Sequence, residues 1–136
     1  MKLKSAASIL SAFALSACGQ GGAASGAGGD PYAGVDAEIR AWRAAIESEN
    51  PLCAAKVEGQ GCEAFEVACK GARELTPADR AAGVSARLVA AMIFQGREPD
   101  GSTSRPGSAF ATFTKADGTW TRTESEPVNL STCAPF

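Results

Sequence analysis

Four cysteines between residues 53 and 133 restrict the fold of this 136-residue chain more than any other feature. An even number of cysteines in a small exported domain predicts two disulfides, and four cysteines allow three pairings. Cys62 and Cys69 stand seven positions apart, a span of about 10 Å along a helix and more than about 20 Å along a strand. Because disulfide-bonded Cα atoms lie within about 7 Å of each other, these two do not pair unless the segment folds back on itself.

The two remaining pairings differ in the partner of Cys53. We favour Cys53–Cys62 with Cys69–Cys133, because Gly59-Gln60-Gly61 lets the first pair close a local turn. The alternative joins Cys53 to Cys69 and Cys62 to Cys133. A zinc site is the competing use of four cysteines, but the chain has no histidine and no CxxC pair, so it lacks the usual ligand spacing. We predict neither a metal nor a cofactor.

The first 17 residues have the layout of a cleaved export signal. Lys2 and Lys4 precede an apolar run from Ala6 to Leu15, which is shorter than the roughly 20 residues of a membrane-spanning helix. The run closes with Leu15-Ser16-Ala17-Cys18, which resembles the lipobox of bacterial lipoproteins. The resemblance implies cleavage before Cys18 and acylation of that residue, which anchors the chain to a membrane. A plain secretory signal is the alternative.

The same resemblance implies a location in the cell envelope. Residue 19 is glycine rather than the aspartate that retains lipoproteins in the inner membrane, so we expect the periplasmic leaflet of the outer membrane. Residues 18–29 would then be the lipidated cysteine and a glycine-rich flexible tether, because such small residues bury too little apolar surface to fold. Residues 30–136 remain as a single globular domain, too short for two.

Residues 30–50 predict a helix. Asp30-Pro31 is typical of a helix start, with an N-cap aspartate and a proline in the first turn, and Asn50-Pro51 ends the helix. Between these signals, apolar residues recur at spacings of three and four, which draws one buried stripe along the helix. The stripe consists of Tyr32, Val35, Ile39, Trp42 and Ile46.

The middle of the chain predicts two strands around a short helix. Residues 62–75 alternate apolar and polar side chains, which favours a strand over a short helix. Thr76-Pro77-Ala78-Asp79 starts a helix that Gly83 ends. Residues 85–95 are the most apolar run after residue 18 and predict a central strand covered on both faces. A buried helix is the alternative for this run.

The last third of the chain predicts a loop and a hairpin. Residues 97–107 hold two prolines and two glycines and predict a long loop. Residues 108–116 and 119–126 predict two strands joined at Asp117-Gly118. A two-residue turn places Lys115 opposite Trp120, whereas a bulged turn moves Trp120 to the other face. The sequence leaves both registers open.

The element order predicts an α+β fold, with the N-terminal helix packed on a small twisted antiparallel sheet of about four strands and two disulfides. This arrangement is similar to the single helix on a curved sheet of cystatin-like and NTF2-like folds. The likeness is one of architecture alone and implies no function.

The residues suited to catalysis are few. The chain lacks histidine, the commonest general base, and we expect its cysteines after residue 18 to be oxidised. Removing the two lysines of the signal leaves 11 basic and 15 acidic residues, a net charge of about −4, which offers no surface for nucleic acid. Glu47 with Glu49 and Glu124 with Glu126 are pairs that an acid–base mechanism could use, or simply solvated surface residues. We predict no catalytic residue.

These observations predict a non-catalytic envelope lipoprotein that binds another envelope protein or a small ligand. Arginine and tryptophan are favoured at interfaces, and the expected contact residues lie in the loop and the hairpin. They are Arg97, Asp100, Arg105, Trp120 and Arg122, with core packing as the alternative role of Trp120. One other hypothesis is an inhibitor or protective factor against an exported hydrolase, which inserts the loop into a cleft. Another is a small hydrolase that uses carboxylates.

Overall fold

The computed structural model describes residues 29–54 and 57–136. The predictions for the signal, Cys18 and nearly all of the tether fall outside these residues. Two helices, one 3-10 turn and four strands follow one another along the chain: α1 (Val35–Glu49), η1 (Pro51–Cys53), β1 (Glu63–Ala72), α2 (Pro77–Ala81), β2 (Val84–Arg97), β3 (Thr103–Ala116) and β4 (Thr119–Glu124).

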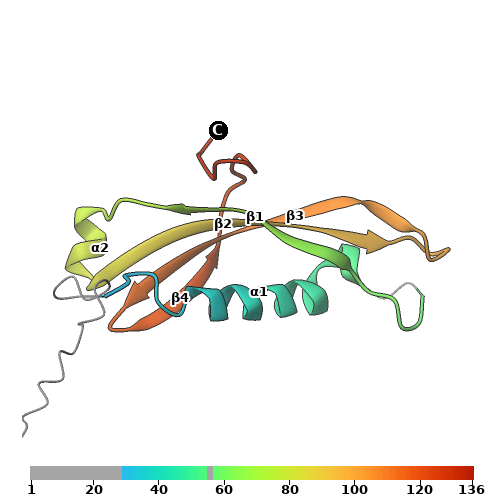
Figure 1. Cartoon of the computed structure of the whole chain (residues 1–136), viewed down its shortest axis with the longest axis horizontal. Helices are drawn as coiled ribbons and strands as arrows, with labels where there is room; N and C mark the ends of the chain where they lie inside the picture. The colour runs from blue at the N-terminus through green and yellow to red at the C-terminus, as the bar shows by residue number, and fades with distance from the viewer. Residues whose placement is uncertain (1–28, 55–56) are drawn as a thin grey trace, which may run out of the picture.

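The strands form one antiparallel sheet in the order β1-β2-β3-β4. Helix α1 lies along one face of this sheet, and the C-terminal segment stands on the opposite face near its middle (Figure 1). The two central strands have 14 residues each, so the sheet is about 45 Å long. The predicted α+β class, with one helix on a four-stranded antiparallel sheet, is confirmed.

Helix α1 begins one turn later than the sequence signals indicate. Asp30 does not cap it; its carboxylate accepts a hydrogen bond from the Tyr32 amide at 2.8 Å, and residues 31–34 form turns. Gly34, at φ 89°, is the residue before the first helical position. Asn50 is extended ahead of Pro51 and ends the helix as predicted.

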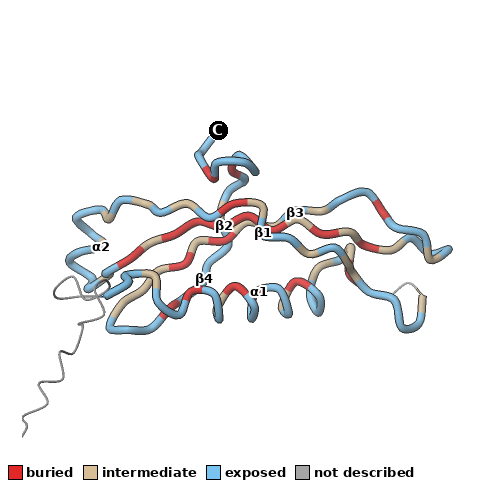
Figure 2. The backbone as a smooth tube through the Cα atoms, in the orientation of Figure 1, coloured by how far each residue is buried: buried red, intermediate tan, exposed pale blue. Residues whose placement is uncertain are grey.

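The predicted apolar stripe of α1 is buried. The four stripe residues that lie within the helix have exposed fractions of 6% or less. They pack on one large cluster with residues of β2, β3 and β4, and the buried residues of helix and sheet face each other (Figure 2). These residues are Val35, Ile39, Trp42 and Ile46.

Strand β1 confirms the strand interpretation of residues 62–75 and adds an irregularity. The pairing of β1 with β2 shifts between Val67 and Cys69. As a result Phe65 stacks on Phe94 on the α1 side, with ring centroids 5.5 Å apart, whereas Cys69 belongs to the core cluster on the opposite face. A single extra residue therefore redirects the second half of the strand.

Strand β2 is central and is covered on both faces at its middle, as predicted. Leu88 and Met92 belong to the cluster under α1. Val89 and Ala91 pack on the other face against the C-terminal segment, which contributes Val128 and Cys133. The second cover is shorter than the helix and reaches only this middle part of the sheet (Figure 1).

The structure contains the favoured pair of disulfides. Cys53 pairs with Cys62 and Cys69 with Cys133, with Cα atoms 4.8 and 5.6 Å apart. In the chain-entropy model the long loop stabilises the fold by about 4 kcal/mol and the short loop by about 3 kcal/mol. The longer crosslink holds the C-terminal segment on the sheet, where the guanidinium of Arg73 also donates to the carbonyl oxygen of Cys133.

The prediction of a long loop over residues 97–107 is wrong. Strand β2 extends to Arg97 and β3 begins at Thr103, so only residues 98–102 connect them. Pro106 lies within the ladder opposite Gln95. Its missing N–H is harmless because Phe110, four residues on, directs its carbonyl toward the β4 side, and residues two apart on a strand point the same way. The sequence signals for a loop therefore mark a strand edge.

The hairpin of β3 and β4 has the two-residue turn. Asp117 and Gly118 have φ angles of 51° and 76°, as a type I′ turn requires. Lys115 consequently pairs with Trp120, which decides the register that the sequence left open. Strand β4 ends at Glu124, two residues before the predicted end. The short helix α2 also forms, with Thr76 and Asp79 in a capping box.

Candidate functional site

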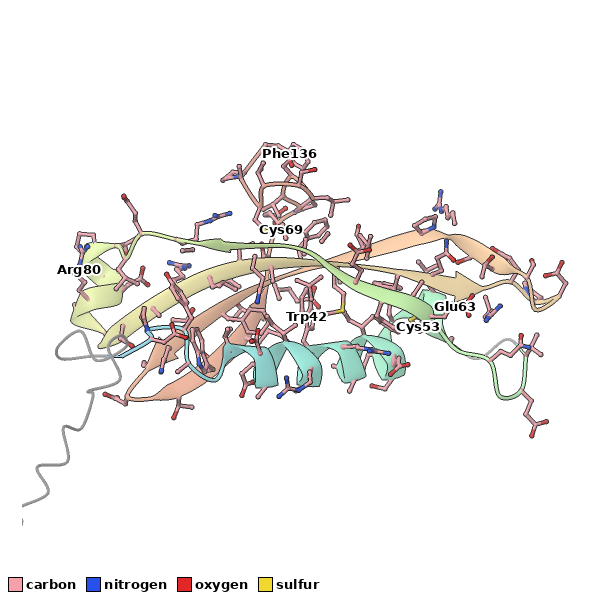
Figure 3. The ribbon with its side chains drawn as sticks, in the orientation of Figure 1. Trp42, Cys53, Glu63, Cys69, Arg80 and Phe136 are labelled. Carbon is pink, nitrogen blue, oxygen red and sulfur yellow. A yellow bond between two sulfur atoms is a disulfide. The ribbon has the colours of Figure 1, made fainter. Side chains whose placement is uncertain are left out.

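The predicted contact residues do not gather in one place. Arg97 and Asp100 lie at the far end of the β2–β3 hairpin. The Arg97 guanidinium pairs with the Glu63 carboxylate at 2.5 Å and donates to the Gly101 carbonyl at 3.2 Å. The first contact joins the hairpin end to β1, where Glu63 is labelled in Figure 3, and the second lies within the hairpin.

Asp100 shapes the same hairpin end through Ser102. Its carboxylate accepts hydrogen bonds from the hydroxyl and the amide of Ser102 at 2.6 and 2.9 Å. These bonds lower the pKa of Asp100, the hydroxyl bond contributing most. Arg105 is exposed on β3. None of these three residues lines one of the three hollows described below.

Trp120 lies in the core, which was the alternative role for this residue. Its side chain is buried within the cluster under α1. The indole N–H donates to the Ala33 carbonyl oxygen at 2.9 Å, which ties β4 to the turn before α1. The burial agrees with core packing, and a contact role for Trp120 stays a prediction. Arg122, two residues on, is exposed and lines a groove.

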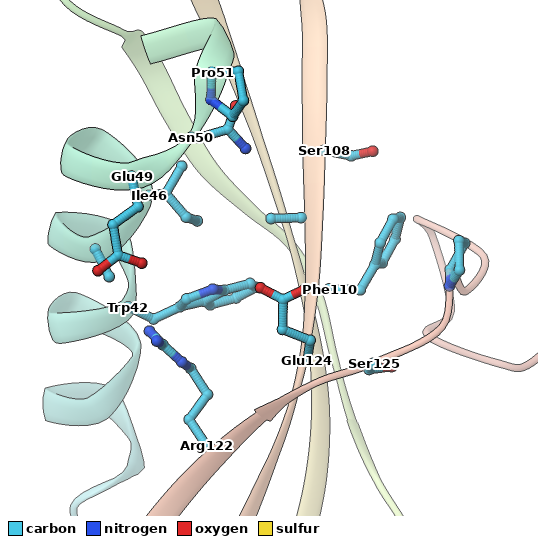
Figure 4. Close-up of a pocket in the computed structure, with 13 residues that line it drawn as sticks. Trp42, Ile46, Glu49, Asn50, Pro51, Ser108, Phe110, Arg122, Glu124 and Ser125 are labelled. Carbon is cyan, nitrogen blue, oxygen red and sulfur yellow. The ribbon is translucent and has the colours of Figure 1, made fainter. Parts of the chain in front are cut away.

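This groove lies between the C-terminal half of α1 and the edge of β3, at the point where β4 ends. Its volume is about 400 Å³. Trp42 points from α1 across the groove, and Arg122 and Glu124 reach into it from β4 (Figure 4). The lining residues are Trp42, Ala45, Ile46, Glu49, Asn50, Pro51, Ser108, Ala109, Phe110, Arg122, Glu124, Ser125 and Pro127.

The groove exists because β3 is much longer than β4. The last pair between these strands joins Ala111 to Glu124. One further bond runs from the Ser125 amide to the Phe110 carbonyl, at 3.1 Å. Within residues 29–54 and 57–136 no strand pairs with β3 on this side before Phe110. Eight residues of β3, from Thr103 to Phe110, therefore have no strand paired on this side among the described residues, and the last three of them line the groove.

The open edge presents backbone groups in a defined order. Because Phe110 directs its carbonyl toward the β4 side and alternate residues share a direction, Ser108 also directs its N–H and C=O outward. Pro106 is the next outward residue and has no N–H to present. Proline at such a position is a common way to limit pairing at a sheet edge. The usable part of the edge is centred on Ser108.

The charges in the groove are predominantly negative. The three ion pairs among the described residues are Lys70–Asp36, Arg87–Asp79 and Arg97–Glu63, so none of them neutralises the groove. Glu49 and Glu124 together outnumber Arg122 by one charge. The last turn of α1 contains no basic residue, and the carbonyl groups at a helix C-terminus carry partial negative charge. The groove is suited to a ligand with a positive group.

Each of the two glutamate pairs that the sequence offered for acid–base chemistry has one member in the groove and one outside it. Glu49 and Glu124 line the groove, whereas Glu47 and Glu126 do not. The sequence had no signal for this division. It depends on the difference in length between β3 and β4 and on the position of the end of α1, which are properties of the assembled sheet.

Two smaller hollows lie elsewhere on the sheet. One, of about 250 Å³, is bordered by Arg73, Glu74, Arg87, Val89 and Thr112 on the face opposite α1. The other, of about 160 Å³, lies between α1 and β1 beside Phe65. Neither one adjoins an open part of a central strand.

No protein-family model, curated protein or solved structure matches this chain. In the part of the chain that the structure describes, no three histidine, cysteine or acidic residues are arranged to hold a metal ion. The same residues include no helix with the length and apolar character needed to cross a bilayer.

Proposed function

We propose that this protein is a lipid-anchored binding protein of the bacterial envelope, and that the groove between α1 and β3 receives a segment of a partner protein. The anchor rests on the resemblance of Leu15-Ser16-Ala17-Cys18 to a lipobox. The two disulfides support export, because such bonds persist in oxidising compartments. The binding role rests on the groove.

The observation that carries the binding role is the combination of groups in this groove. An indole and a phenyl ring, from Trp42 and Phe110, stand beside three charged side chains that make no ion pair among the described residues. Aromatic rings and arginine are the residue types that contribute most at protein interfaces. The walls are rigid, because Trp42 also packs edge-to-face on Phe113, with centroids 5.7 Å apart.

The binding role is tested by a photo-crosslinking amino acid placed at Glu49 or, as a matched control, at Glu47. Both glutamates are exposed on α1, but only Glu49 lines the groove. We expect position 49 in intact cells to capture an envelope polypeptide that position 47 does not. The purified polypeptide should then bind the mature domain and lose affinity with Glu124→Gln, which removes a groove carboxylate. Equal capture at both positions, or no capture at position 49, contradicts the proposal.

The anchor is tested by mass spectrometry of the protein from a membrane fraction. We expect a mature chain that begins with an acylated Cys18, and a Cys18→Ala variant that leaves the membrane fraction. An unmodified amino terminus at Met1 contradicts the lipoprotein assignment. This test is independent of the groove.

A carboxylate-dependent hydrolase is the second candidate, because Glu49 and Glu124 share the groove. Both residues are exposed, whereas acid–base catalysis favours a site that excludes water. Their exposure therefore favours a role in binding a positively charged group of a partner over a role in catalysis. Turnover of an envelope polymer that Glu124→Gln abolishes would support the hydrolase instead.

The inhibitor hypothesis assigned partner binding to a long loop, and the short β2–β3 connection takes the place of that loop. The hairpin end extends beyond α1 (Figure 1), but its loop comprises only residues 98–102. Replacing these five residues by a glycine-serine linker should leave binding of the captured partner unchanged. Loss of binding would assign the contact to the hairpin end and would favour an inhibitor.

A further inference from the structure

We infer that the partner segment binds as an added β-strand on the open edge of β3, in the line that β4 vacates, with a basic side chain directed to Glu49 and Glu124. This inference rests on the proposed binding function and specifies the conformation and charge of the ligand. Extended peptides commonly bind proteins by completing a sheet edge.

The backbone geometry favours this mode. The pairing of β4 with β3 extends as far as Ala111. One more hydrogen bond joins Ser125 to Phe110, and the chain then leaves the sheet. The vacant line beside residues 103–110 of β3 is about 26 Å long. The N–H and C=O of Ser108 and the N–H of Phe110 face this line, so an added strand finds donors and acceptors in place.

The groove offers contacts on both sides of such a strand. On the α1 side, Trp42 and Ile46 line the groove, and Ala109 packs on the same cluster. On the other side, Phe110 packs with the cluster of the C-terminal segment, and Pro127 lines the groove. Successive side chains of a strand point to opposite faces. The side chains on each face of an added strand would therefore contact one of these two groups of residues.

The charges select among extended segments. Glu49 and Glu124 would attract a lysine or arginine on the α1 side, and the C-terminal carbonyl groups of α1 act in the same direction. A second copy of this chain is a poor occupant. Two grooves of equal negative charge would face each other, and Pro106 interrupts the donors that a long symmetric pairing of two β3 edges needs.

The test begins with selection from a random peptide library displayed on phage, with the mature disulfide-bonded domain as bait. We expect the selected peptides to combine β-forming residues with lysine or arginine. Their affinities are then compared between the wild type, Ser108→Pro and Ser108→Val. Proline removes the outward N–H at a position where Pro106 shows that the ladder tolerates it, and valine keeps the N–H as the matched control.

We expect Ser108→Pro to weaken binding about tenfold or more, as the loss of an interfacial hydrogen bond predicts, and Ser108→Val to bind like the wild type. Equal binding by both variants overturns strand addition. If Ser108→Pro does not fold, hydrogen exchange at Ser108 in the wild type replaces it. Slower exchange of that amide on peptide binding supports the inference, and unchanged exchange contradicts it.

The charge selection has its own matched pair of variants. Glu49→Gln with Glu124→Gln removes the groove carboxylates, whereas Glu47→Gln with Glu126→Gln removes the same charge outside the groove. We expect only the first pair to weaken binding, by about tenfold at low salt, and to flatten its salt dependence. Equal effects of both pairs contradict the role of Glu49 and Glu124.

The outcomes separate this inference from the proposed function. If position 49 captures a polypeptide but the selected peptides bind the Ser108→Pro variant as tightly as the wild type, the proposed binding function stands and strand addition is overturned. A selection that yields no peptide also overturns strand addition. Absence of capture at position 49 contradicts the binding role itself.

Discussion

The two halves of β3 differ in what lies beside them. Residues 111–116 pair with β2 on one side and β4 on the other. Residues 103–110 have β2 as their one paired strand among the described residues, and Ser108, Ala109 and Phe110 of this half line the groove. One strand thus serves as a closed part of the sheet along half its length and as an open edge along the other half.

The contrast shows how this small domain separates stability from recognition. In the closed half Phe113 is fully buried, and Trp120 on β4 seals the adjacent core. In the open half most side chains are partly or fully exposed, and Pro106 limits what can pair there. Within β3, the unpaired backbone groups lie in the half that contributes less to the core.

The largest difference between the halves should appear in core truncations. Phe113→Ala removes a fully buried ring under α1 and should lower the free energy of unfolding by about 4 kcal/mol. Phe110→Ala removes a partly buried ring in the open half and should cost about half as much. Urea unfolding with the disulfides intact measures both. Equal losses would remove the distinction between the halves.

Glycine positions provide a second comparison. A Cβ at Gly96, beside the open half, would overlap the Leu52 carbonyl oxygen of η1, so Gly96→Ala should cost about 3 kcal/mol through overpacking. Gly118→Ala at the closed end meets no atom within 4 Å and should cost about 1 kcal/mol, because of its positive φ alone. Thermal unfolding ranks the two, and the reverse order would show that η1 does not pack there.

The closed half also depends on one specific hydrogen bond. Trp120→Phe removes the indole N–H that binds the Ala33 carbonyl and should destabilise the protein by about 1–2 kcal/mol. The affinity of the groove for a selected peptide should stay within twofold of the wild type, roughly 0.4 kcal/mol. A large loss of affinity at unchanged stability would place Trp120 in the binding site.

The smallest expected effect is a pH dependence of the unfolding free energy that arises from Asp79 of α2. Hydrogen bonds from Thr76, and then the charge of Arg87, lower the pKa of Asp79. A carboxylate with a lowered folded pKa stabilises the protein above its unfolded pKa, and this contribution is lost as the pH falls through the folded value. The unfolding free energy should therefore decline below about pH 4, and less so in Asp79→Asn. An unchanged pH profile in that variant would contradict the role of the capping box.

Local signals in the sequence were sufficient for much of the fold. The apolar stripe of α1, the Asp117-Gly118 turn and the Gly59-Gln60-Gly61 segment inside the Cys53–Cys62 loop each act within a few residues. The structure follows all three. The exception is the start of α1, where Asp30 closes a turn before the helix instead of capping it.

Signals that depend on distant neighbours could not be interpreted from the sequence. Pro106 and Gly107 suggest a loop, but Pro106 occupies an outward edge position, and a side chain at Gly107 would collide with Leu52 and Phe94. The groove could not be predicted from the sequence for the same reason. Nothing near Glu124 reveals that β3 continues beside it without a partner.

Hydrogen exchange along β3, with and without a selected basic peptide, tests the central claim most directly. In the free protein the Ser108 amide should exchange rapidly, while the outward amides of Thr112 and Thr114, which face β4, are protected. Addition of the peptide should slow exchange at Ser108 and leave the other two unchanged. A Ser108 amide that is already as protected as Thr114, or one that the bound peptide does not slow, would contradict the account.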